Sequence, residues 1–220
     1  MRGRFITFEG GEGSGKSTHA AALAKRLKLF GIEVVLTREP GGSAGAEIIR
    51  HILLSGIAKP LGAETETILF AAARDDHVRT TIRPALVAGN WVICDRFIDS
   101  TRVYQGALVK VDAKLIRSLE RVTVGAAMPD LTFILDVPAK VGLARAKRRR
   151  GKDATDRFEA ESLEFHEALR LAYAALADKE PKRCVVIDGR APRDIVSERI
   201  WEAVAERLNP QPRLAEAATP

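Results

Sequence analysis

The hydrophobic and polar positions of the chain alternate between two periods, one typical of buried strands and one typical of helices. Short apolar runs, each bounded by turn residues, predict strands at residues 5–9, 33–37, 91–95, 131–136 and 184–187. Segments of helical period predict helices at residues 16–30, 44–55, 64–88, 112–124, 140–149, 160–178 and 194–208. Strands that alternate with helices indicate an α/β protein, with a five-stranded parallel sheet covered by helices on both faces.

Single residues mark several boundaries of this pattern. Gly31 follows the first helical segment, and we expect it to end that helix because glycine readily adopts a left-handed conformation. Pro84 lies inside the segment 64–88 and predicts a bend just before it. We expect one domain over residues 1–208 and a disordered tail over residues 209–220, which contain three prolines.

A glycine-rich segment lies between the first predicted strand and the first predicted helix, and it fits the pattern G-x-x-x-x-G-K-[ST]. Its glycines allow backbone N–H groups to face a phosphate, and the following helix N-terminus favours negative charge. The lysine reaches the terminal phosphates and the serine hydroxyl binds Mg²⁺. The predicted phosphate-binding residues are Gly10, Gly11, Glu12, Gly13, Ser14, Gly15, Lys16, Ser17 and Thr18. The sequence therefore predicts a protein that binds ATP or GTP.

Charged residues end or directly follow the predicted strands, and ligands of such folds bind at the carboxyl ends of the strands. These residues are Glu9, Arg38, Glu39, Asp95, Arg96, Asp136 and Asp188. Asp95 is placed to hold Mg²⁺ opposite Ser17, although an aspartate at a strand end can also cap the next turn. Arg96 beside it indicates a second anion next to the nucleotide. Since a phosphate acceptor is largely ionised at neutral pH, it needs no general base.

The composition narrows the class of protein. The chain has no run near the ~18 apolar residues of a membrane span, and its N-terminus leads directly into a strand, so we expect neither a membrane segment nor a signal peptide. Cys94 and Cys184 are far apart and each adjoins a strand, which favours buried free thiols over a disulfide. Together these features predict a cytoplasmic protein.

The basic charge of the chain is concentrated in one segment. Residues 145–157 hold seven basic and two acidic residues, which accounts for most of the net charge of +6. A nucleic-acid surface usually spreads its basic residues along a face, so this cluster favours a small, highly charged ligand. None of the histidines falls at the strand ends, and we expect surface or helix-packing roles for His19, His51, His77 and His166.

Several motifs occur in the order found in the bacterial thymidylate kinase family. They are residues 10–18, Arg38-Glu39-Pro40-Gly41-Gly42, Phe70 with Arg74, Asp95-Arg96-Phe97 followed by Ser100-Thr101 and Tyr104-Gln105-Gly106, and Asp156-Arg157-Phe158-Glu159. The resemblance extends over about residues 4–208, and the second and fourth motifs are far more specific than the first. It implies a P-loop nucleoside-monophosphate kinase fold and phosphorylation of dTMP to dTDP by Mg-ATP. It also implies a homodimer.

The same resemblance assigns roles in binding dTMP. It places Arg38, Arg96 and Arg50 at the dTMP phosphate. It places Phe70 against the thymine ring, with Arg74, Gln105 and Thr101 at the polar edge of the base. It places Tyr104 against the sugar, where a 2′-hydroxyl would crowd it, and Glu12 near the 3′-hydroxyl. Glu39 is implied to assist in placing the phosphate or Mg²⁺.

The basic segment 145–157 resembles the mobile lid of the family. Members without an arginine inside the P-loop carry the catalytic arginine in the lid, and this P-loop has none. The candidates are Arg145, Lys147, Arg149 and Arg150, and the spacing leaves the choice among them open. The catalytic group that we expect from the resemblance is Lys16, Arg96 and Glu12 together with Arg145 and Arg149 of the lid, and which lid residue is decisive stays open.

Other functions are compatible with a P-loop. A nucleoside kinase would need a carboxylate base beside the acceptor hydroxyl, and Glu39 could serve, but Arg38 and Arg96 favour an acceptor that already carries a phosphate. A kinase for another monophosphate also fits, as does an ATPase switch that partners DNA. dTMP is the substrate we expect, with no nucleic-acid or membrane partner.

Overall fold

A five-stranded parallel sheet forms the centre of the molecule, with the strand order β2-β3-β1-β4-β5. The computed structural model describes residues 2–150 and 158–211. The strands are β1 (Phe5–Glu9), β2 (Val34–Arg38), β3 (Trp91–Asp95), β4 (Leu131–Asp136) and β5 (Cys184–Asp188). The predicted fold class and all five predicted strands are confirmed. The second strand begins and ends one residue later than the sequence pattern indicated.

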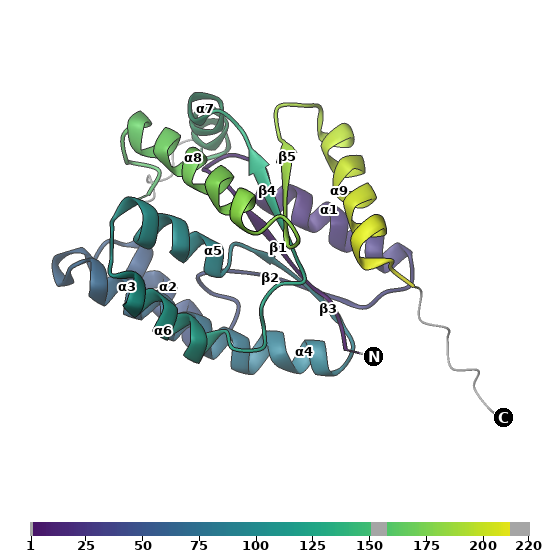
Figure 1. The fold of residues 1–220 in the computed structure, drawn as a ribbon, viewed down its shortest axis with the longest axis horizontal. Coiled ribbons are helices and arrows are strands. Elements are labelled where there is room, and N and C mark those ends of the chain that lie inside the picture. The colour runs from purple at the N-terminus through teal and green to yellow at the C-terminus, as the bar shows by residue number, and fades with distance from the viewer. Residues whose placement is uncertain (1, 151–157, 212–220) are drawn as a thin grey trace.

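Helices cover both faces of this sheet, as Figure 1 shows. They are α1 (Lys16–Leu29), α2 (Ala44–Leu54), α3 (Ala63–His77), α4 (Arg83–Val87), α5 (Ile98–Thr101), α6 (Ala113–Thr123), α7 (Ala139–Arg150), α8 (Leu163–Lys179) and α9 (Arg193–Leu208). A 3₁₀ helix, η1, spans Lys59–Leu61, and π-helical segments span Val78–Ile82 (η2) and Arg102–Leu108 (η3). Gly31 follows the end of α1 with a φ of 81°, as predicted.

The central strand β1 is buried along its whole length, and its side chains alternate between the two faces. Ile6 and Phe8 pack in a core with α1 and α9, which lie against each other on one face. Phe5 packs in a second core on the opposite face, against residues of η2, α4 and α5. The same alternation directs the side chain of Glu9 toward the second face, at the carboxyl end of the sheet.

Two stretches differ from the sequence prediction. Residues 98–108 form α5 and η3, although no helix was predicted there. The helix predicted at 160–178 begins only at Leu163, because Ser162 caps its N-terminus by accepting a hydrogen bond from the backbone N–H of Phe165. The long helix predicted at 64–88 is a continuous run of α3, η2 and α4, and its π-helical segment comes just before Pro84, where a bend was expected.

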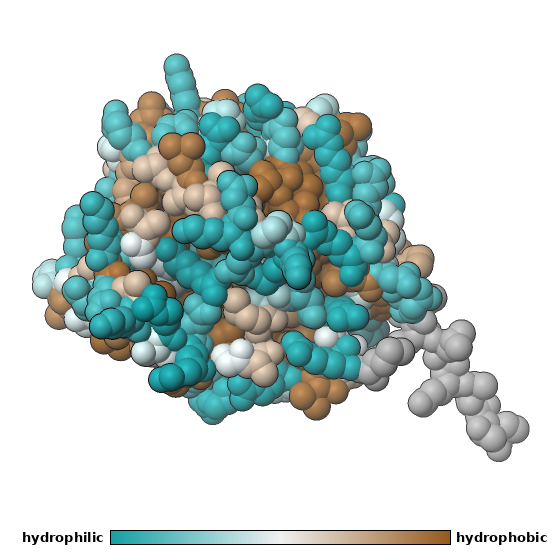
Figure 2. All heavy atoms as spheres, in the orientation of Figure 1, coloured by the Kyte–Doolittle hydropathy of each residue, from teal (hydrophilic) through white to brown (hydrophobic). Residues whose placement is uncertain are grey.

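The surface agrees with the composition. Figure 2 shows a face on which hydrophilic residues predominate and hydrophobic areas are scattered among them. None of the helices within the described residues combines the length and apolar character that crossing a membrane requires. Cys94 and Cys184 are both buried free thiols, as predicted. Residues 151–157 of the expected lid and 212–220 of the expected tail lie outside the described residues.

Helix α7 contains the first residues of the basic segment 145–157, and its backbone packs directly against the P-loop. A Cβ atom at Gly13 would overlap the carbonyl oxygen of Gly142, and one at Gly142 would overlap the carbonyl oxygen of Glu12. Only glycine at both positions allows the two backbones to come this close. This contact fixes where the arginines of α7 lie relative to the phosphate-binding loop.

Candidate active site

The glycine-rich loop joins β1 to α1 and has the backbone shape expected of a phosphate cradle. Gly10, Gly13 and Gly15 adopt positive φ angles of 129°, 65° and 99°. The Lys16 ammonium donates hydrogen bonds to the carbonyl oxygens of Gly10 (3.1 Å) and Gly11 (2.7 Å). Burial disfavours its charge and Arg96 repels it, so the pKa of Lys16 falls to about 8. The lysine is thus held inside the loop.

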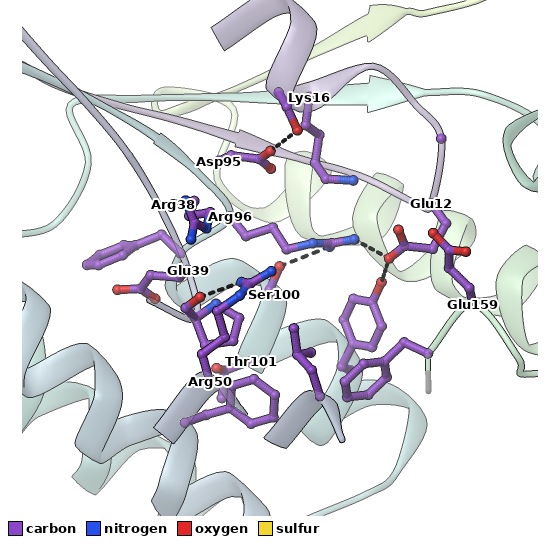
Figure 3. A pocket seen from close by; sticks show the side chains of 18 of the residues that line it. Glu12, Lys16, Arg38, Glu39, Arg50, Asp95, Arg96, Ser100, Thr101 and Glu159 are labelled. Atoms are coloured by element: carbon purple, nitrogen blue, oxygen red, sulfur yellow. Dashed lines mark hydrogen bonds and ion pairs between the residues drawn. The ribbon is translucent and has the colours of Figure 1, made fainter. Parts of the chain in front are cut away.

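A cavity of about 330 Å³ opens beside this loop at the carboxyl ends of the strands. Lys16, Ser17 and Asp95 line it together with every residue that the sequence assigned to the acceptor: Arg38, Glu39, Arg50, Phe70, Arg74, Arg96, Thr101, Tyr104 and Gln105. In Figure 3, Lys16 and Asp95 lie at one end of the view and Thr101 and Arg50 at the other, with Arg96 between them. Residues from distant parts of the chain therefore share one cavity, while their individual roles stay predictions.

Not every predicted residue contributes to the cavity. Gly13, Gly15 and Thr18 line it, whereas Gly10, Gly11 and Ser14 are not among the lining residues. Two strand-end carboxylates expected at the same rim are instead engaged by other arginines. Asp136 pairs with Arg170 (2.5 Å) and Asp188 with Arg190 (2.9 Å). Asp136 and Asp188 thus stand at the carboxyl ends of β4 and β5, as the sequence indicated, but neither lines the cavity, whereas residues at the ends of β2 and β3 do.

Arg96 carries a buried positive charge in the cavity. Its φ angle of 68° lies in the left-handed region, which is uncommon for arginine. Its guanidinium forms an ion pair with Glu12 and also donates to Ser100 Oγ and the Gly10 carbonyl, both at 3.3 Å. Tyr104 stacks its ring near the guanidinium (5.4 Å) and donates its hydroxyl to Glu12 (3.3 Å). Burial alone would raise the pKa of Glu12, but Arg96 and Lys16 lower it to about 2.

Ser17 and Asp95 meet at the other end of the cavity. The Ser17 hydroxyl donates a hydrogen bond to Asp95 Oδ2. The described residues include no cluster of three or more His, Cys, Asp or Glu side chains that could hold a metal ion by themselves. A hydroxyl and one carboxylate are nevertheless a suitable pair of oxygen donors for Mg²⁺, which usually completes its shell with water and substrate phosphates. The residues present therefore fit the predicted site.

A buried carboxylate connects β1 to the turn that carries Arg96. Glu9 has no exposed surface and accepts hydrogen bonds from the backbone N–H groups of Phe97 (2.8 Å) and Ser100 (3.2 Å). It also accepts from the Ser100 hydroxyl (2.7 Å) and the Tyr173 hydroxyl (2.9 Å). Burial is the main reason why the pKa of Glu9 rises to about 7. The sequence treated Glu9 only as a strand end, because its partners lie about ninety to more than 160 residues away.

A second buried network holds Glu39. Its carboxylate accepts from Arg74 Nε (2.8 Å) and contacts His77 Nδ1 (3.1 Å). Both partners are buried, and Arg74 also donates to Thr101 Oγ1 (3.1 Å). His77, for which a surface or helix-packing role was expected, is buried and does not itself line the cavity, but it contacts Glu39, which does. Its position one helical turn after Arg74 on α3 was the available signal.

The structure separates Arg145 and Arg149, two of the four candidates for the catalytic residue of the lid. Arg149 lines the cavity and lies 3.5 Å from Glu159. Arg145 donates to the backbone carbonyl of Gly189 (3.0 Å) and is not among the residues that line the cavity. The side chain of Lys147 is exposed. Because Arg145 and Arg149 are four residues apart on one helix, their spacing alone could not distinguish them.

A parallel sheet with a P-loop after its first central strand, an adjoining cavity and convergent arginines defines a P-loop kinase of small phosphorylated molecules. The thymidylate kinase family model matches residues 8–200. The chain is 63% identical to the thymidylate kinase of Bradyrhizobium sp. (strain BTAi1 / ATCC BAA-1182) over 94% of its length and 92% of that protein. It is 64% identical to that of Afipia carboxidovorans over 94% of its length and 91% of that protein.

A solved structure agrees with these matches. The crystal structure of thymidylate kinase from Ehrlichia chaffeensis superposes with a TM-score of 0.73 at 35% identity, over 93% of this chain and 99% of that one. The chain therefore belongs to the thymidylate kinase family. Its activity is the ATP-dependent phosphorylation of dTMP to dTDP.

The raised pKa of Glu9 predicts how stability depends on pH. Between its ordinary value of 4.5 and about 7, the folded protein keeps a proton that the unfolded chain has released. The unfolding free energy should therefore fall as the pH rises through this window, by up to about 3 kcal/mol. Glu9→Gln, whose amide can accept from the two backbone N–H groups and donate to the two hydroxyls, should remove that part of the pH dependence.

Urea unfolding at pH 5.5 and pH 7.5 checks this expectation. Thr7→Val is a matched control, because Thr7 is buried on the same strand and bonds Thr132 Oγ1 (2.7 Å) instead of the Arg96 turn. The control should keep the dependence of the wild type. Equal pH dependence in wild type and Glu9→Gln would show that Glu9 does not titrate in this window.

Proposed function

We propose that the cavity holds ATP and dTMP end to end, with the phosphates of ATP at the P-loop and the phosphate of dTMP at the arginines. The observation that supports this proposal is the set of residues that line the cavity. It includes the P-loop residues Lys16 and Ser17 as well as Phe70 and Arg74, which we expect at the base of dTMP. The arginines Arg38, Arg50 and Arg96 line the same cavity. A γ-phosphoryl group can then pass directly to the acceptor phosphate.

The chemistry needs positive charge more than it needs a base. Both substrates carry several negative charges, and their repulsion at contact distance costs many kcal/mol unless it is compensated. Phosphoryl transfer is accelerated mainly by positioning and by electrostatic stabilisation of the equatorial oxygens. The Lys16 ammonium and the Arg96 guanidinium would supply this stabilisation. Glu39, already engaged by Arg74 and His77, would not act as the base of a nucleoside kinase.

Mg²⁺ would be held by Ser17 and Asp95 together with phosphate oxygens of ATP. When bound, it neutralises charge on the β- and γ-phosphates. The hydrogen bond between Ser17 and Asp95 supports this proposal, because it brings two oxygen donors together beside the P-loop. The chain's own contribution is to orient these two oxygens from α1 and β3.

Recognition of dTMP would combine an aromatic surface with a polar edge. The ring of Phe70 lies 6.3 Å from that of Phe158, and Phe70, Arg74 and Gln105 all line the cavity. Thymine offers a π face for the first and hydrogen-bonding groups for the others. Tyr104, fixed by its hydrogen bond to Glu12, would lie against the deoxyribose and disfavour a 2′-hydroxyl.

Arg149 is the arginine of the basic segment that we propose for catalysis. It lines the cavity, whereas Arg145 is bonded to the Gly189 carbonyl. An arginine whose guanidinium contacts the transferred phosphoryl group in the transition state can raise the rate by several orders of magnitude. Arg145 would instead fasten α7 to the loop after β5.

We also propose a homodimer, formed through the face built by α2, α3 and α6. These helices pack in sequence against one another, and Figure 1 shows them together at one side of the molecule. Each presents a largely exposed aliphatic residue: Ile48 is 68% exposed, Ile68 46% and Val122 72%. Burial of such residues between two copies would stabilise the dimer.

Three arginine variants test the assigned roles. Arg96→Ala and Arg149→Ala should each lower kcat for dTMP at least about a hundredfold, because each removes a charge that stabilises the transferring phosphate. Arg145→Ala should lower it less than about tenfold. ATP binding should survive in Arg96→Ala. Steady-state kinetics and titration with an unreactive ATP analogue measure these effects, and near-normal turnover of Arg96→Ala would contradict its role.

Sedimentation tests the dimer. The wild type should sediment at twice the chain mass of 24.0 kDa, and Val122→Lys should shift it toward the monomer because a charge would be buried between the copies. Lys114→Ala, a change of charge elsewhere on α6, serves as the control and should leave the mass unchanged. A wild type that sediments as a monomer at micromolar concentration would end this proposal.

A further inference from the structure

We propose that His77 is a positioning residue for base recognition, because it holds Glu39 and, through Glu39, the guanidinium of Arg74. This inference rests on the proposed role of Arg74 at the thymine ring. His77 itself is completely buried and is not among the residues that line the cavity. Its effect on the substrate must therefore pass through another side chain.

The two nitrogens of His77 have different partners, and these partners define its tautomer. Nδ1 lies 3.1 Å from Glu39 Oε1, and Nε2 lies 2.7 Å from Thr37 Oγ1. An ionised carboxylate only accepts hydrogen bonds, so Nδ1 carries a proton and donates it to Glu39. In the neutral ring, Nε2 then accepts a hydrogen bond from the Thr37 hydroxyl. The histidine thus joins a strand-end hydroxyl to a carboxylate of the cavity.

Glu39 transmits this constraint to Arg74. Oε2 of Glu39 accepts from Arg74 Nε (2.8 Å), while Nη2 donates to the Phe97 carbonyl (3.2 Å) and to Thr101 Oγ1 (3.1 Å). The guanidinium also lies 5.3 Å from the centre of the Phe97 ring. These contacts fix its plane, and they use Nε and Nη2. Nη1 is the nitrogen that remains for a bound base.

The turn after β2 is shaped around the same histidine. Gly42 has a φ of 85°, and a Cβ atom there would overlap both Thr37 Oγ1 and His77 Nε2. Because no larger residue fits beside the imidazole, the backbone of this turn packs directly onto it. His77 therefore holds the turn that carries Glu39 from two sides, by a hydrogen bond and by packing.

Two amide variants separate this role from a general structural one. In His77→Asn the side-chain N–H takes the place of Nδ1, so it can still donate to Glu39. In His77→Gln the amide takes the place of Nε2 instead, so Glu39 Oε1 loses its partner while Oε2 keeps Arg74. We expect Asn to keep KM for dTMP within about threefold of the wild type, and Gln to raise it about tenfold, as for one lost hydrogen bond to a charged group.

The measurements are KM for dTMP, KM for ATP, kcat, and the ratio of kcat/KM for dTMP over dCMP. For Gln, the ratio should fall with the rise in KM, while KM for ATP should stay within about twofold. His51→Asn, on the exposed side of α2, is the control and should change none of them. Thr37→Val removes the other hydrogen bond of His77, and it should leave the ratio and both KM values within about threefold.

Each outcome decides the proposal. Equal losses in Asn and Gln, a Thr37→Val effect as large as that of Gln, or a parallel rise in KM for ATP would overturn it. Arg74→Ala separates this failure from a failure of the proposed site: if it leaves KM for dTMP unchanged, the assignment of Arg74 to the base is wrong. If Arg74→Ala raises KM while both His77 variants behave as the wild type, only the role of His77 fails.

Discussion

The buried charge of Arg96 is the constraint around which the rest of the site is arranged. The guanidinium lies at the carboxyl end of β3, next to the P-loop lysine, where two positive groups would repel each other. Glu12 balances that charge from the other side, and Tyr104 fixes Glu12 in turn. A buried ion pair of this kind contributes little net stability, since the desolvation of both groups offsets their attraction. It does keep a positive charge ready in the cavity for an anionic substrate.

The sheet explains how this charge is held in place. Arg96 adopts a left-handed backbone conformation, and its N–H donates to the carbonyl of Phe8 on β1 (2.9 Å). Glu9, the next residue of β1, accepts two backbone N–H groups from the following turn. An unfavourable backbone angle persists only where surrounding contacts determine it, and here the central strand provides them. Strand β1 therefore connects the hydrophobic core to the turn that carries Arg96, and the same strand continues into the P-loop.

The sequence predicted the parts of this molecule that depend on local pattern. Buried apolar runs identified all five strands, and the glycine-rich motif located the phosphate cradle between β1 and α1. Residues 98–108 were missed because short α and π segments have no long helical period. The second strand is one residue later than predicted because Glu33 and Arg38 give similar polar boundaries. Such shifts do not move the residues that line the cavity.

The sequence pattern did not predict contacts between residues that are far apart in the chain. From the sequence, Glu9 was only a strand end and His77 only a histidine with a surface or helix-packing role, since their partners lie far away in the chain. Arg145 and Arg149 are four residues apart on α7, and the structure is needed to show that Arg149 lines the cavity while Arg145 donates to the Gly189 carbonyl. Motifs of the family compensated for much of this, because they brought together residues that periodicity alone left unconnected.

A crystal structure with dTMP and an unreactive ATP analogue tests the central claim most directly, because it shows which anion takes the charge of Arg96. The account predicts that the dTMP phosphate lies within hydrogen-bond distance of the Arg96 guanidinium and faces the terminal phosphate at Lys16. A dTMP phosphate bound away from Arg96, with the ion pair to Glu12 unchanged, would contradict it.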